Sequence, residues 1–271
     1  MPLQQLVEYF NDRLEHEHNA GFRPFILNND KVDGLFGPIR VGTQLNPIRT
    51  NDNHQTIIGH AAQLKVSANH APILQTTELD NLLDPQKQTH NSSESIINFD
   101  RLTRTVHMLN YLPQSHRDEL LFLDVDPRHI LGVKTDHGVY FEEVIGQCGL
   151  QTNNVTIAMT VNGLYSRFYH SLLKGLANYQ RRGYRIALKF DYHSLDKSTF
   201  DLIVKSSPDF VGLFATDSDK FYEHKIKEKL QQLISLSASI DAKTILLNIS
   251  ENKQNQLAQA IGFDLLQGSN P

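Results

Sequence analysis

Apolar residues follow two different periods along the chain, and the change of period predicts where strands and helices lie. Residues 119–125 and 155–161 are short and almost continuously apolar, which is typical of strands buried on both faces of a sheet. Residues 164–182 instead space their apolar side chains as a helix does. From residue 119 onward, strand and helix alternate, which predicts parallel strands joined by helices.

The clearest repeat of this kind is residues 183–214. Residues 185–190 are typical of a strand, residues 196–205 of a short helix, and residues 210–214 of the next strand, so the segment predicts one βαβ unit. In βαβ enzymes the chemistry lies just after the first strand. Here that place is held by Lys189, Phe190, Asp191 and Tyr192.

Eight strands are predicted in all, which favours a closed α/β barrel of the (β/α)8 TIM-like type. The first two are joined by a short turn at residues 51–53 and form an antiparallel hairpin, a departure from the plain pattern. The predicted strands are residues 41–48, 56–64, 119–125, 155–161, 184–191, 210–215, 242–249 and 263–268.

The segment before the barrel is different in character. Residues 3–14 predict an amphipathic helix, which either packs on the following domain or contacts a partner. Residues 20–38 contain several Gly and Pro residues and are interpreted as a connector. We therefore predict two parts, residues 1–40 and a barrel domain of residues 41–271. Within that domain, residues 76–83 and 96–112 predict helices, and residues 84–95 predict a polar loop.

Composition excludes several classes of function. The net charge is −4 with no basic block, so nucleic-acid binding has no electrostatic support. Cys148 is the single cysteine, which excludes disulfide and thiolate-zinc frameworks within one chain. No apolar run approaches the roughly 18 residues of a membrane helix, and no secretory leader is visible, so we expect a soluble, cytoplasmic protein without a membrane segment.

Eight short motifs, in order and at similar spacing, resemble those of the EAL family, the phosphodiesterases of the bacterial messenger cyclic di-GMP. They are residues 46–48 (NPI), 59–62 (GHAA), 123–125 (LDV), 157–161 (IAMTV), 183–188 (GYRIAL), 207–211 (SPDFV), 248–254 (NISENKQ) and 262–268 (GFDLLQG). The resemblance covers the chain from about residue 41 onward. It implies an EAL-type barrel whose first strand runs antiparallel to the others, in agreement with the hairpin.

The resemblance also implies where the site residues of the family fall. In that family two Mg²⁺ or Mn²⁺ ions, held by carboxylates and an amide, activate a water molecule that attacks a phosphodiester. The corresponding positions are His60, Asp124, Ala158, Lys189, Phe190, Asp191, Gly212, Leu247, Ser250 and Gln267. Apolar side chains and a lysine stand where oxygen ligands are needed, so we expect no catalytic residue, no metal ion and no other cofactor.

These substitutions leave several functions open. The first is a non-catalytic EAL-like regulator of bacterial motility, biofilm or adhesion that acts by binding another protein, and the resemblance also implies a possible homodimer. The second is a cyclic di-GMP receptor that does not cut the nucleotide and uses Lys189, Asp191 and Gln267. An active phosphodiesterase is a third. A fourth is an unrelated barrel enzyme using Asp124, Asp191, Lys189 and His60, since a lysine near two carboxylates is a recurrent acid–base arrangement.

Overall fold

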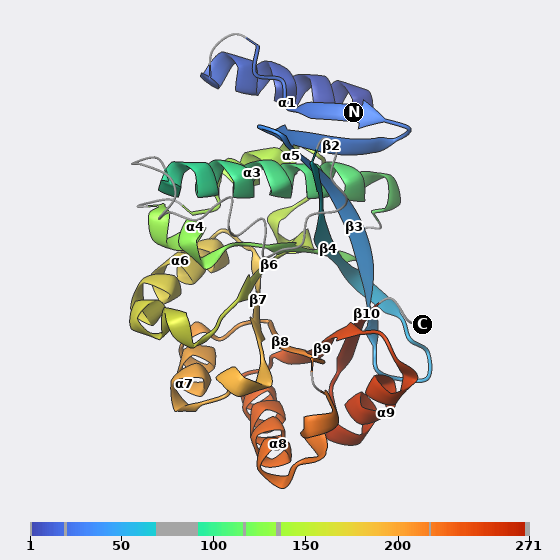
Figure 1. Ribbon diagram of the computed structural model, residues 1–271, viewed down its shortest axis with the longest axis vertical. Helices are drawn as coiled ribbons and strands as arrows, with labels where there is room; N and C mark the ends of the chain where they lie inside the picture. The colour runs from blue at the N-terminus through green and yellow to red at the C-terminus, as the bar shows by residue number, and fades with distance from the viewer. Residues whose placement is uncertain are drawn as a thin grey trace. The chain divides into compact units, whose positions relative to one another are not determined.

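A computed structural model describes residues 2–18, 21–68, 92–115, 118–133, 137–216 and 218–268 (Figure 1). The chain divides into two compact units. The first unit is built from Met1–Leu45, Ala62–His116 and Gly132–Gln151, and the second from Asn46–Ala61, Arg117–Leu131 and Thr152–Pro271. Residues 1–40 therefore share a unit with three stretches that the sequence pattern places in the barrel domain.

The second unit is centred on a closed eight-stranded barrel, as the sequence predicts. The strands follow one another around the barrel in the order β3-β10-β9-β8-β7-β6-β5-β4, and a pairing of β3 with β4 closes the ring. The strand β3 is antiparallel to β10, whereas the pairs from β5 to β10 are parallel. The strands are β3 (Ile39–Thr50), β4 (Ile57–Ala68), β5 (Leu120–Asp124), β6 (Val155–Thr160), β7 (Arg185–Phe190), β8 (Phe210–Phe214), β9 (Lys243–Ile249) and β10 (Leu265–Gly268).

Helices connect these strands and lie on the outside of the barrel (Figure 1). They are α4 (Pro127–Gly132), α6 (Tyr169–Arg181), α7 (Lys197–Ser206), α8 (His224–Ser239) and α9 (Asn252–Ile261). The helix predicted at residues 164–182 begins later than expected, because the 3₁₀ turn η3 (Gly163–Phe168) precedes α6. A second 3₁₀ turn, η5 (Ser218–Tyr222), precedes α8. Shorter 3₁₀ turns are η1 (Leu112–Gln114), η2 (Thr152–Asn154) and η4 (Tyr192–Ser194).

Apolar side chains fill the inside of the barrel. They form the interior cluster, with further apolar residues packed against its edges. Its buried members are Ile48, Phe122, Ala158, Ala187, Phe210, Ile245, Leu247 and Leu265, and the flanking residues are Ile58, Ala61, Leu120 and Phe214. Along β5 and β9 these residues stand two positions apart, as expected where alternate side chains of a strand point to one face. The inside of the barrel is therefore a packed core, and polar groups that could bind a ligand are confined to its ends.

The first unit contains a hairpin that the sequence pattern missed. The strands β1 (Phe25–Asn28) and β2 (Lys31–Phe36) pair antiparallel, and β2 continues by pairing with β3. The interpretation of residues 20–38 as a connector is therefore wrong. Pro24, Gly37 and Pro38 flank the short strands, whereas Gly34 lies within β2. The tight turn places Asn29 and Asp30 at positive φ, a conformation these two residue types tolerate.

The helix α1 (Leu3–His18) packs within the first unit. Leu6, Val7 and Phe10 are buried, in keeping with the predicted apolar stripe. The Asn11 amide donates to the carbonyl of Phe25 at 2.8 Å, and its oxygen accepts from the Phe25 N–H at 2.9 Å. This pair of hydrogen bonds fixes α1 on β1, which also lies within residues 1–40.

The remaining helices of the first unit are α3 (Ser92–Tyr111) and α5 (Val139–Gln147). The first begins inside the predicted polar loop of residues 84–95, so residues 92–95 are helical and that part of the prediction is wrong. The predicted helix of residues 76–83 and the rest of the loop lie outside the described residues. In the part of the chain that the structure describes, no helix has the length and apolar character needed to cross a membrane.

Candidate functional site

Two charged side chains meet at the carboxyl ends of the parallel strands. Lys189 is the penultimate residue of β7 and Asp124 is the last residue of β5. The Lys189 Nζ donates a hydrogen bond to Asp124 Oδ1 at 2.5 Å. Their side chains are 14% and 62% exposed, so the lysine is largely enclosed while the carboxylate faces solvent. The structure thus brings together two of the residues that the sequence singled out.

A glycine on the neighbouring strand makes room for the lysine. A Cβ added to Gly212 on β8 would lie 3.3 Å from Lys189 Cγ and 2.7 Å from Leu247 Cδ1. The Lys189 Nζ also lies 5.7 Å from the centroid of the Phe214 ring, within the range of a cation–π contact. The lysine stem is therefore fixed between apolar neighbours, and its ammonium group is directed to Asp124.

The layer next to this ion pair is apolar. Ala158 on β6 and Leu247 on β9 are buried members of the interior cluster, and Phe214 packs against it. None of these side chains has a lone pair to offer a cation or a reacting group. Of the expected site positions, Ala158 and Leu247 therefore belong to the packing of the barrel.

His60 is not with the other predicted site residues. Its Nδ1 lies 3.2 Å from Glu119 Oε2, just before β5, whereas the adjacent Ala61 packs against the interior cluster. The neighbour of His60 that packs against the barrel interior is thus Ala61, while His60 itself contacts Glu119. Ile58 packs against the same cluster three positions before Ala61, so simple alternation along β4 does not by itself separate His60 from it.

Phe190 also lies apart from the interior cluster. It is fully buried but is not a member of the interior cluster, and it follows Lys189 directly on β7. Alternation places it on the outer face of the strand, under the surrounding helices. Asp191 comes next, at the N-cap of the short turn η4, where its carbonyl accepts from the Ser194 N–H at 2.9 Å and its side chain makes no capping bond.

Gln267 and Ser250 have local structural contacts. The buried Gln267 accepts a hydrogen bond of 2.9 Å through Oε1 from the N–H of Asn248, a residue at φ 60° near the end of β9. The exposed Ser250 donates its N–H to Gln254 Oε1 at 2.8 Å, at the start of α9. The sequence pattern did not predict the hydrogen bond from Asn248 to Gln267. The one sequence feature that could have indicated it is an Asn next to the end of a strand.

The donor set at this end of the barrel does not fit a divalent cation. Mg²⁺ needs several oxygen ligands in near-octahedral geometry, and Asp124 is already paired with an ammonium group. Among the residues that the structure describes, no three His, Cys, Asp or Glu side chains gather where they could hold a metal ion. What the arrangement offers chemically is a fixed cation beside a solvent-facing carboxylate.

Comparison with known proteins identifies the fold. No protein-family model and no curated protein matches the sequence. Among solved structures, the chain is similar to the Bacillus subtilis YkuI protein with an EAL domain (21% identity, TM-score 0.64, covering 84% of this chain and 54% of that one). It is also similar to Klebsiella pneumoniae BlrP1 (15%, 0.66, 86% and 55%) and to the Xanthomonas citri FimX EAL domain (12%, 0.67, 98% and 91%).

These similarities confirm the predicted EAL-type barrel with its antiparallel first strand. Because the identities are low, the shared property is the fold. The chain spans about half the length of YkuI and BlrP1 and most of the FimX EAL domain.

Proposed function

We propose that this protein is a non-catalytic, EAL-like regulator in cyclic di-GMP signalling that acts by binding another protein. The observation that carries the proposal is the Lys189–Asp124 ion pair, set above an apolar layer at the carboxyl end of the barrel. In a (β/α)8 barrel this end is where catalytic groups are found. A barrel that keeps its framework while the described residues at this end form no cluster of oxygen ligands supports a binding role over a hydrolytic one.

The physical argument concerns charge and ligand number. Metal-dependent attack on a phosphodiester needs oxygen atoms from several strand ends around one or two cations. The Lys189 ammonium group beside Asp124 repels a divalent cation. In a partly buried site, the Coulomb repulsion between these charges costs on the order of several kcal/mol. Ala158 and Leu247 provide no oxygen to offset that cost.

The neighbours in fold suggest the pathway. The YkuI structure is a complex with the substrate c-di-GMP and calcium, and the FimX EAL domain is in complex with c-diGMP. We carry over from them the connection to this messenger. The regulatory role and the protein partner are our proposal for this chain.

The decisive experiment is a hydrolysis assay. The full chain is incubated with cyclic di-GMP and Mg²⁺ or Mn²⁺, and linear dinucleotide is measured by chromatography beside an active phosphodiesterase. We expect no product. Turnover that is lost in Asp124→Asn would overturn the non-catalytic assignment, whereas a trace that persists in this variant would come from a contaminant.

A second candidate is a receptor that binds cyclic di-GMP without cutting it. It is favoured by the Lys189 ammonium, because a phosphate can compete with Asp124 for a cation at a strand end. Calorimetry with cyclic di-GMP tests it, using Lys189→Met and, as a matched control, Lys243→Met. Binding that only the first variant weakens supports the receptor, and the absence of heat at high micromolar ligand excludes it.

The protein partner is tested separately. The tagged full chain is used to capture bound proteins, and light scattering measures whether the chain itself forms a dimer. The proposal predicts a partner at stoichiometric amount. A monomeric chain with no partner, no nucleotide binding and no activity would contradict it.

A further inference from the structure

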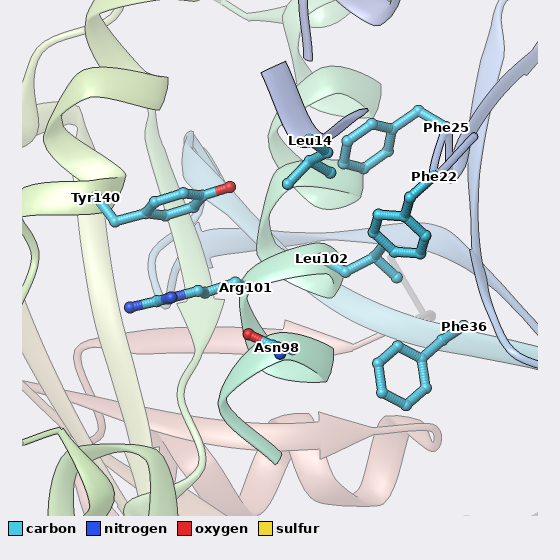
Figure 2. Close-up of a pocket in the computed structure, with 8 residues that line it drawn as sticks. All are labelled: Leu14, Phe22, Phe25, Phe36, Asn98, Arg101, Leu102 and Tyr140. Carbon is cyan, nitrogen blue, oxygen red and sulfur yellow. The ribbon is translucent and has the colours of Figure 1, made fainter. Parts of the chain in front are cut away.

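The first unit contains a cavity of about 280 Å³ that none of the functions above uses. Five elements converge on it, namely α1, β1, β2, α3 and α5, together with the segment that leads into β1. Its lining residues are Leu14, Phe22, Phe25, Phe36, Asn98, Arg101, Leu102 and Tyr140 (Figure 2). All of them belong to the first unit.

The walls of this cavity have two chemical sides. Figure 2 shows three phenyl rings, those of Phe22, Phe25 and Phe36, on one side, and Arg101 with Tyr140 on the other. The apolar wall is partly open, because Phe22 is 40% exposed while Phe25 is buried. An open apolar cavity with a few polar groups gathered on one side is the usual form of a small-molecule site.

Arg101 is held in place without being neutralised. Its guanidinium carbon lies 5.0 Å from the centroid of the Tyr140 ring, a cation–π contact that orients the planar group. The other arginines nearby are paired: Arg13 with Glu143, and Arg104 with Asp100. Within the described ranges Arg101 has no carboxylate partner, so the cavity presents a positive charge that a ligand can neutralise.

We propose that this cavity binds a small amphipathic carboxylate, with its acid group on Arg101 and its apolar part against the phenyl rings. A planar guanidinium binds a carboxylate through two parallel hydrogen bonds, which favours an acid over a neutral group. The volume sets the size of the ligand. A cavity of about 150 Å³ accepts benzene, so this one has room for roughly ten non-hydrogen atoms. This proposal does not rest on the function proposed for the barrel.

Binding has a consequence for stability. The ligand contacts residues from separate elements, including Leu14 on α1, Phe36 on β2 and Tyr140 on α5. Because it binds the folded unit and not the unfolded chain, it raises the melting temperature in proportion to the logarithm of its concentration.

The test uses the full chain and two acids, octanoate and 3-phenylpropionate, each compared with its neutral amide. Affinity is measured by calorimetry, and the shift of melting temperature is measured in parallel. We expect at least one acid to bind and its amide to bind about tenfold more weakly, as for the loss of one charged hydrogen bond. The two acids separate an aromatic ligand from an aliphatic one.

Three variants locate the site. Arg101→Met is expected to weaken the acid about tenfold and to leave the amide unchanged, because the apolar stem of the side chain is kept. Phe22→Ser, at a partly exposed position, is expected to weaken acid and amide alike. Arg185→Met, in the second unit, is the matched control and is expected to change neither affinity.

Three results would overturn the proposal. The first is that neither acid gives heat or a melting shift at millimolar concentration. The second is that the amide binds as tightly as its acid, a comparison on the unaltered chain that holds even if Arg101→Met fails to fold. The third is that Arg101→Met, with its melting temperature intact, binds the acid as well as the original chain.

Discussion

Lys189 reaches across one intervening strand to Asp124. The two residues are 65 positions apart, and β6 lies between their strands in the barrel. The lysine is the more enclosed partner, so the pair consists of a sheltered cation that depends on a carboxylate at the surface. This asymmetry determines what each substitution should do.

Removing the carboxylate should cost more than removing the lysine. Asp124→Asn leaves the Lys189 ammonium without its partner, and we expect a loss of about 1 kcal/mol in the free energy of unfolding. Lys189→Met should be close to neutral, because the apolar side chain packs on Phe214 and Leu247. Urea unfolding of both single variants and the double variant measures the coupling.

The exposed pair Lys205–Asp201 on α7 is the matched control for this cycle. Its coupling energy should be about 0.5 kcal/mol or less, since both side chains are solvated. A larger coupling there than between Lys189 and Asp124 would contradict the view that enclosure strengthens the site pair.

Gly59 should not tolerate a side chain. A Cβ at this position would lie 2.3 Å from the backbone oxygen of Leu120 on the adjacent strand, and a backbone atom in a closed barrel has little freedom to move. We expect Gly59→Ala to lower the free energy of unfolding by about 3 kcal/mol, the upper part of the range for overpacking. Thermal unfolding measures the loss.

Gly146 provides the opposite case. It lies inside α5, and a Cβ there would meet no heavy atom within 4 Å. Gly146→Ala should therefore raise the free energy of unfolding by about 0.5–1 kcal/mol through helix propensity. If Gly59→Ala and Gly146→Ala changed the free energy of unfolding equally, the short distance between position 59 and the Leu120 backbone would not be the reason for glycine at position 59.

Asp196 should link the stability of α7 to pH. The N–H of Thr199 at 2.9 Å, and then the Ser198 hydroxyl, hold the pKa of this carboxyl below its ordinary value. Because the folded pKa is the lower one, the contribution is present above the unfolded pKa of about 3.9 and is lost as the pH falls through the folded pKa. Asp196→Ala should cost about 1 kcal/mol at pH 7.

The pH profile separates charge from capping. The difference between the original chain and Asp196→Ala should narrow below about pH 4, whereas Asp196→Asn should keep most of the cap without titrating. Unfolding in urea from pH 3 to pH 7 measures both. A difference that stays constant over this range would contradict the stabilisation of the charged form.

Cys148 should be unreactive in the folded protein. Burial raises the pKa of its thiol to about 12, so the thiolate that reacts with alkylating agents is scarce at pH 8. Because it is the single cysteine of the chain, labelling by iodoacetamide reports on this residue alone. We expect slow labelling in buffer and fast labelling in urea. Equal rates would show that the thiol is accessible and ordinary in the folded state.

Much of the fold was predictable from local pattern. The parallel strands are short apolar runs between helical periods, so their number and order could be predicted without a template. The hairpin of β1 and β2 could not, because Phe25–Asn28 is too brief to show a period and the Gly and Pro residues around it resemble those of a connector.

The site was less predictable than the fold. Lys189 and Asp124 lie at the carboxyl ends of parallel strands, and the predicted order of strands places these ends at the same side of the barrel. His60 and Phe190 lie apart from that pair: His60 contacts Glu119, and Phe190 follows Lys189 on the other face of β7. A sequence match does not show which residue of a strand packs inward, whereas the tertiary structure shows Ala61 packed against the interior cluster.

From residue 119 onward the sequence by itself determined the order of strands and helices, because hydrophobic period and turn residues act over a few positions of the chain. Only the tertiary structure decided that Lys189 pairs with Asp124, since closing the barrel sets the distance between strands that are far apart in sequence. The cavity beside Arg101 was decided in the same way, because its walls come from five elements whose packing no local pattern encodes.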